Sequence, residues 1–158
     1  MNLKGTLLIA AVLMLAFHAA AEEKTQFQPW SENLFRQIEK EHGNMAVRRM
    51  RHLHDIVATN YHKTIREKLE ITNRTLNQLP WITDQQKYRK NDYWATPMET
   101  IATFGGDCED IAIAKFVMLR SMAVPKENMS LGYGKVKRTG EAHIVLVYSA
   151  HPSKPVGE

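Results

Sequence analysis

The segment from Asp107 to Met122 constrains the fold most strongly, because it reads as a helix that is apolar on nearly every side. After Asp110 its only charged residues are Lys115 and Arg120. A helix that is apolar all round lies at the centre of a globular domain. It must end before Pro125, since the residue preceding a proline disfavours helical backbone. The rest of the chain is therefore expected to supply layers that cover this helix.

Amphipathic helices are expected on the N-terminal side of the buried helix. Apolar residues recur at three- and four-residue steps from Ser31 to Val57, with Ser31 as a plausible N-cap and a break at Gly43-Asn44. A second region with this pattern runs from His62 to Leu79. Residues 81–97 are polar and aromatic without a clean period, which predicts a loop.

Two segments that follow the buried helix look like strands, Ser130 to Val136 and Ala142 to Ser149, and β-branched residues are prominent in the second. Helices first, then a buried helix, then strands indicate an α+β fold with an antiparallel sheet packed on the helix. The chain is 44% hydrophobic and 24% charged, which is ordinary for a globular protein, and no repeat is present. One domain with one core is therefore expected.

The first 21 residues are expected to be a secretory signal peptide. Lys4 precedes an apolar stretch from Thr6 to Phe17, and Ala19-Ala20-Ala21 forms an A-x-A cleavage site. The apolar stretch is shorter than the roughly 20 residues that a membrane-spanning helix needs. Residues 22–158 are then the exported domain. The full sequence carries a net charge of only +4 with acidic residues interleaved, so no nucleic-acid partner is expected.

The single cysteine of the chain, Cys108, lies at the start of the buried helix. In an oxidising compartment one cysteine cannot form an internal disulfide, so its presence calls for a reason. It could be a buried apolar residue, or a reactive thiolate favoured by the positive end of the helix dipole. The preceding Gly105-Gly106 allows backbone conformations closed to other residues, and Asp107 can cap the helix.

Three acidic residues surround this thiol and disfavour its ionisation: Asp107, Glu109 and Asp110. One explanation is that they stabilise the helix N-terminus and that the cysteine is inert. The other is a bound cation, because hard oxygen ligands suit calcium, whose charge would offset theirs. The residues themselves leave both explanations open.

His143, at the start of the second expected strand, is the natural partner for a Cys108 thiolate. A strand can present an imidazole towards the N-terminus of a neighbouring helix, which would complete a nucleophile and general base pair. The alternative is a histidine at a strand end whose ring hydrogen-bonds a backbone carbonyl. Residue types and spacing do not decide between the two.

The motifs nevertheless resemble a known family. The segment NDYWATPMETIATFGGDCEDIAIAKFVMLRSM followed by EAHIVLVYS, in this order and at this spacing, resembles the bacterial transglutaminase-like cysteine proteinases of the LapG type. A looser likeness extends upstream through Trp30 and EKLEITNRTLNQLPW, and the resemblance covers most of residues 30–156.

The resemblance implies a papain-like, transglutaminase-like core, with N-terminal helices, a central buried helix that carries the cysteine, and an antiparallel sheet. On this basis Cys108 is the catalytic nucleophile and His143 the general base. The family also binds calcium through acids that flank the cysteine, which here are Asp107 and Glu109, with Asp110 as a candidate third ligand.

The resemblance also implies a role in the cell. Members of this family are periplasmic endopeptidases that cleave a large surface adhesin and so release the cell from a biofilm. An inner-membrane receptor governed by cyclic di-GMP holds the protease in check. By this likeness the chain is a periplasmic, calcium-dependent cysteine endopeptidase, with a surface adhesin as substrate and such a receptor as partner.

One feature departs from the family pattern. The family completes its catalytic triad with an aspartate shortly after the histidine strand, whereas no aspartate follows Asp110 in this sequence, which ends KPVGE. The domain is therefore expected to be truncated at its C-terminus. Two alternatives stay open: a non-catalytic module that binds calcium or the receptor, and a cross-linking enzyme in which an amine replaces water.

Overall fold

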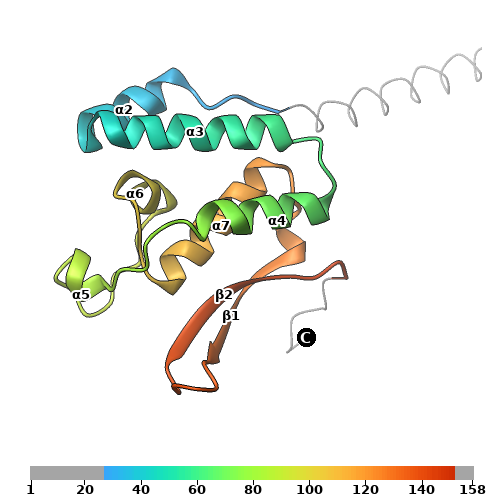
Figure 1. Ribbon diagram of the computed structural model, residues 1–158. Helices are drawn as coiled ribbons and strands as arrows, with labels where there is room; N and C mark the ends of the chain where they lie inside the picture. The colour runs from blue at the N-terminus through green and yellow to red at the C-terminus, as the bar shows by residue number, and fades with distance from the viewer. Residues whose placement is uncertain (1–26, 152–158) are drawn as a thin grey trace, which may run out of the picture.

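The computed structural model describes residues 27–151. The signal peptide expected at residues 1–21 lies outside the described residues. Figure 1 shows three layers: a pair of helices, α2 and α3, then a middle layer that holds α4, α6 and α7, then a hairpin of two strands. This combination of helices with a small antiparallel sheet confirms the α+β class.

The first layer begins as the sequence predicts. α2 spans Glu32–His42, and the hydroxyl of Ser31 accepts a hydrogen bond from the Leu34 N–H at 3.2 Å, so Ser31 is the N-cap. Gly43 has φ 79°, a conformation that suits glycine, and it separates α2 from α3 (Asn44–Asn60). The predicted break at this glycine is therefore confirmed.

The next helix is shorter than the predicted region from His62 to Leu79. α4 spans Ile65–Leu76, because Thr64 and Glu67 form a capping box that sets its first turn. The Lys68 side chain is buried, with an exposed fraction of 8%, and its Nζ donates to the Met122 carbonyl at 2.7 Å. This bond ties α4 to the C-terminal end of the central helix.

The prediction of a loop over residues 81–97 is wrong in part. A one-turn helix, α5, spans Asp84–Lys87, and α6 spans Pro97–Ala102. Each begins with a threonine capping box, Thr83 with Gln86 in α5 and Thr96 with Glu99 in α6. Both helices are too short to show an apolar period, so their sequence signals were these T-x-x-Q and T-x-x-E patterns and, in α6, Pro97 at the first helical position.

The central helix, α7, spans Cys108–Ser121 and begins and ends as predicted. It packs against α4, α6 and β2. Its buried residues are Asp110, Ala112, Ala114, Met118 and Leu119.

None of the helices within residues 27–151 is both long enough and apolar enough to cross a lipid bilayer.

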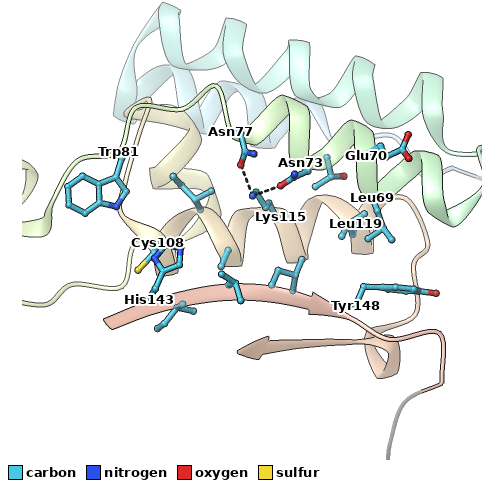
Figure 2. A pocket seen from close by; sticks show the side chains of 16 residues that line it. Leu69, Glu70, Asn73, Asn77, Trp81, Cys108, Lys115, Leu119, His143 and Tyr148 are labelled. Carbon is cyan, nitrogen blue, oxygen red and sulfur yellow. Dashed lines mark hydrogen bonds between the residues drawn. The ribbon is translucent and has the colours of Figure 1, made fainter. Parts of the chain in front are cut away.

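The two predicted strands form an antiparallel hairpin, β1 (Met129–Lys135) and β2 (Ala142–Tyr148). Leu146 and Tyr148 of β2 are half-buried and pack against the core. Residues that alternate with them along β2 are exposed, among them His143, which lies opposite Gly134. The hairpin thus packs one face on the helices and brings His143 to the start of α7, as Figure 2 shows.

Candidate active site

A cavity of about 590 Å³ lies between α4, α7 and β2. Cys108 and His143 both line it, although 34 other residues separate them in the sequence. Figure 2 shows their side chains next to each other at one end of the cavity, with Trp81 beside them. The structure therefore brings the predicted nucleophile and base together at the N-terminus of the central helix.

The Cys108 thiol is half-buried and forms a hydrogen bond with the neighbouring Glu109. Its Sγ donates a hydrogen bond to Glu109 Oε2 at 3.0 Å. Burial, and then this hydrogen bond to Glu109, raise the pKa of the Cys108 thiol, while the backbone N–H of Ile144 acts in the opposite direction. In this structure burial and the hydrogen bond to Glu109 together favour the protonated thiol.

Asp107 occupies the N-cap position of α7, but it does not serve as a cap. Its side chain accepts no capping hydrogen bond, and the first bond of the helix runs from the Ile111 N–H to the Asp107 carbonyl at 3.2 Å. The idea that Asp107 caps the helix is therefore wrong. The first-turn N–H groups receive no side-chain cap, so they can donate to another acceptor.

Asp110 explains one of the two glycines before the helix. The Asp110 side chain is fully buried, and its Oδ1 accepts a hydrogen bond from the Ala95 N–H at 2.8 Å. A Cβ on Gly106 would lie 2.5 Å from Asp110 Oδ2, so only glycine leaves room for this carboxylate. The Asp110 carboxylate is therefore held between the Ala95 N–H and the backbone of Gly106.

Carboxylates from separate segments converge behind Cys108. One oxygen each of Asp84, Asp107 and Asp110 lie within 4.8 Å of one another. Three buried oxygens of this acidic cluster have no hydrogen-bond partner among the described residues: Asp84 Oδ1, Asp107 Oδ1 and Asp110 Oδ2. Buried carboxylate oxygens that lack donors and face one another are a fitting set of ligands for a hard divalent cation.

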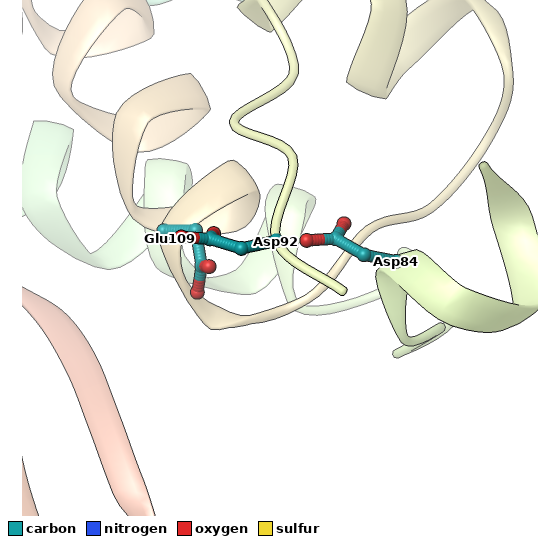
Figure 3. Close-up of side chains that lie close together, drawn as sticks. All are labelled: Asp84, Asp92 and Glu109. Atoms are coloured by element: carbon teal, nitrogen blue, oxygen red, sulfur yellow. The ribbon is translucent and has the colours of Figure 1, made fainter. Parts of the chain in front are cut away.

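Glu109 belongs to a second group that shares Asp84 with the first. Oxygens of Asp84, Asp92 and Glu109 also lie within 4.8 Å of one another. Figure 3 shows these three side chains close together at the start of α7. Sequence reasoning missed Asp84 and Asp92, which lie on the segment expected to be a plain loop. Of the three expected ligands, Asp107 and Asp110 meet in one group, and Glu109 lies in the other.

Crowding of these carboxylates shifts their ionisation. Burial, followed by the negative charges of Glu109, Asp84 and Asp110, raises the pKa of Asp107 to about 7. Burial is also the main cause that raises the pKa of Asp110. The cluster therefore binds protons near neutral pH that the same side chains release in an unfolded chain.

We expect the free energy of unfolding to fall as the pH rises from about 4 to about 7 when divalent cations are chelated. Over this window the folded protein holds a proton on Asp107 that the unfolded chain has released, so rising pH favours the unfolded state. Urea denaturation at several pH values in EDTA measures the slope. Asp107→Asn should flatten it. If the free energy of unfolding falls with pH as steeply in Asp107→Asn as in the unmodified protein, Asp107 is not the group responsible.

Comparison with known proteins agrees with this geometry. A family model described as bacterial transglutaminase-like cysteine proteinase (BTLCP) matches residues 30–152. No match is found among curated protein sequences.

Solved structures of one bacterial protein resemble most of this chain. Calcium-bound LapG of Legionella pneumophila is 28% identical, with a TM-score of 0.67, over 78% of this chain and 68% of that one. LapG of the same organism after EGTA treatment is 27% identical, with a TM-score of 0.68, over 79% of this chain and 67% of that one.

Proposed function

Because the chain belongs to the bacterial transglutaminase-like cysteine proteinases, we propose that it is a calcium-dependent cysteine endopeptidase in which Cys108 is the nucleophile and His143 the general base. One observation carries the proposal: the two side chains line one end of a single cavity at the N-terminus of α7. A cysteine at a helix N-terminus beside an imidazole is the arrangement that acyl transfer through a thiolate requires.

The reaction follows from the positions of these groups. His143 takes the proton of the Cys108 thiol, and the sulfur attacks the carbonyl carbon of the scissile peptide bond. The uncapped N–H groups of the first turn of α7 donate to the oxyanion that forms. His143 then gives the proton to the leaving amine, which leaves a thioester on Cys108. Water, deprotonated by His143, hydrolyses the thioester and frees the enzyme.

Calcium is the cation that we propose for the acidic cluster. The Legionella pneumophila structure is described as calcium-bound, and the unpartnered oxygens of Asp84, Asp107 and Asp110 fit such an ion. When bound, calcium would supply positive charge that offsets the carboxylates near the thiol. Glu109, which now accepts the hydrogen bond from the thiol, is a ligand candidate through its contact with Asp84 and Asp92.

The cellular role is proposed from the family. Residues 1–21 would direct export to the periplasm, where the domain of residues 22–158 acts. A large surface adhesin would be its substrate, so that cleavage releases the cell from a biofilm. An inner-membrane receptor that responds to cyclic di-GMP would bind the enzyme and withhold it from the adhesin.

A second candidate is a non-catalytic module that binds calcium or the receptor. One observation favours it: the Cys108 thiol donates its hydrogen bond to Glu109. A thiol held by a carboxylate is a poor nucleophile until that bond is broken.

Alkylation of Cys108 separates the two candidates. In calcium-containing buffer, we expect iodoacetamide to react at a rate that is already near its plateau well below pH 8.5, the ordinary cysteine pKa. The activated thiolate is the physical reason. Mass spectrometry of the modified protein over a pH series measures the rate. His143→Ala should move the profile up towards that of a free thiol. A profile in the unmodified protein that follows free cysteine would favour the non-catalytic module.

A further inference from the structure

Trp81 is a large aromatic residue that the fold leaves open to solvent beside the nucleophile. Its exposed fraction is 63%. A single exposed apolar side chain is common and needs no explanation. This one, however, lines the same cavity as Cys108 and His143, and Figure 2 shows its indole ring next to them at the same end. Its position calls for a reason in the chemistry of the site.

The backbone of Trp81 is fastened to the segment that carries the cysteine. Trp81 forms a parallel bridge with Gly106, in which the Gly106 N–H donates to the Pro80 carbonyl at 3.2 Å and the Ile82 N–H donates to the Gly106 carbonyl at 3.0 Å. Gly105 has φ 141°, and a Cβ on it would lie 2.7 Å from the Pro80 carbonyl oxygen. This close approach of two segments fixes the backbone of Trp81 beside the segment that leads into Cys108.

Apolar side chains line the cavity near Cys108, and the carboxylate and ammonium side chains that line it, Glu70 and Lys115, lie farther away. Ile111 and Ile144 line the cavity together with Trp81. Lys115 also lines it, but Lys115 follows Cys108 by seven residues on α7, so it lies about 10 Å along the helix axis. An extended peptide covers that distance in about three residues. The group that adjoins the scissile bond therefore meets the indole and not the ammonium.

We propose that Trp81 is a specificity-determining residue, whose indole ring forms an apolar wall for the substrate side chain next to the scissile bond. The substrate class is then a peptide segment with an apolar residue at that position. This inference rests on the proposed function. The flat face of the indole contacts the side chain and the extended backbone together, and burial of that surface on binding provides the preference.

Two alkylating reagents that differ only in an apolar group test the wall. Iodoacetamide and N-benzyliodoacetamide both react with Cys108 when the sulfur displaces iodide and forms a thioether. We expect the benzyl reagent to gain about two- to tenfold in rate over iodoacetamide, relative to the same ratio for glutathione, because its ring packs on the indole before reaction. Trp81→Ala should abolish this gain, while Trp81→Phe should keep most of it.

The control is Tyr133→Ala, which removes an aromatic residue with an exposed fraction of 73% that does not line the cavity. It should leave both rates unchanged. The proposal is overturned if the unmodified protein reacts no faster with N-benzyliodoacetamide than with iodoacetamide, relative to glutathione. It is also overturned if the faster reaction with the benzyl reagent persists in Trp81→Ala. Since alkylation needs no substrate and no third triad residue, these results stand even if the chain cleaves no peptide bond.

Discussion

When the Cys108→Ala variant replaces the unmodified protein in cells, we expect none of the new N-termini that the unmodified protein produces in cell-surface proteins. Without sulfur no thioester can form, and His143 has no proton to remove. Loss of a nucleophile that works together with a base lowers the rate by about 10⁴-fold or more. N-terminal labelling of surface proteins, followed by mass spectrometry, measures the effect and identifies any protein that is cleaved.

Folding must be separated from chemistry in this comparison. Cys108 is only half-buried, so Cys108→Ala should leave the midpoint of thermal unfolding nearly unchanged. Ser121→Ala, at the other end of α7, is the matched control and should keep full cleavage. If the same N-termini appear with Cys108→Ala in a folded protein, Cys108 is not the nucleophile, and the proposed function fails with it.

Removal of calcium is expected to have the second-largest effect, on stability and cleavage together. A ligand that binds only the folded state at 100 times its Kd adds about 2.7 kcal/mol to the free energy of unfolding. For a chain of this size that corresponds to a rise in Tm of roughly 5–10 °C. We expect this rise when calcium is added after EGTA treatment, and we expect peptide cleavage to be lost in EGTA.

Asp84→Asn tests whether the acidic cluster holds the ion. Asp84 belongs to both carboxylate groups and its Oδ1 is buried without a partner among the described residues, so its charge is the one that both groups share. The variant should lose most of the calcium-dependent rise in Tm. Asp55→Asn, with a side chain that is 76% exposed on α3, should keep all of it. A full calcium response in Asp84→Asn would place the ion elsewhere.

The burial of the central helix could be predicted from its composition. A segment without a polar face must be buried, so the position of α7 and the layers that cover it follow from the residues alone. The second strand, β2, was predictable from its β-branched residues Ile144, Val145 and Val147, which favour the extended backbone of a packed sheet. Cys108 and His143 were found through their motifs. The structure adds that they share a cavity, while their catalytic roles stay predictions.

The cation site could be predicted only in part. Asp107 and Asp110 stand beside the cysteine in the sequence, but Asp84 and Asp92 come from a segment with no period and reach the site through tertiary contacts. No local rule places such residues together. The hydrogen bond from the thiol to Glu109 depends on a side-chain rotamer, which a sequence pattern does not specify.

α4 holds α7 at two points along its length. Lys68 donates to the Met122 carbonyl at one end, and Lys115, in the middle of α7, donates to Asn73 of α4 and to Asn77, the C-cap of α4, at 2.7 Å each. These bonds connect α4 to both the middle and the C-terminal end of α7. A shortened gene that began at Trp81 would keep both carboxylate groups, the sulfur and the imidazole, yet would lose the brace that sets their alignment. The smallest fragment that can be transplanted with its chemistry must therefore start before Lys68.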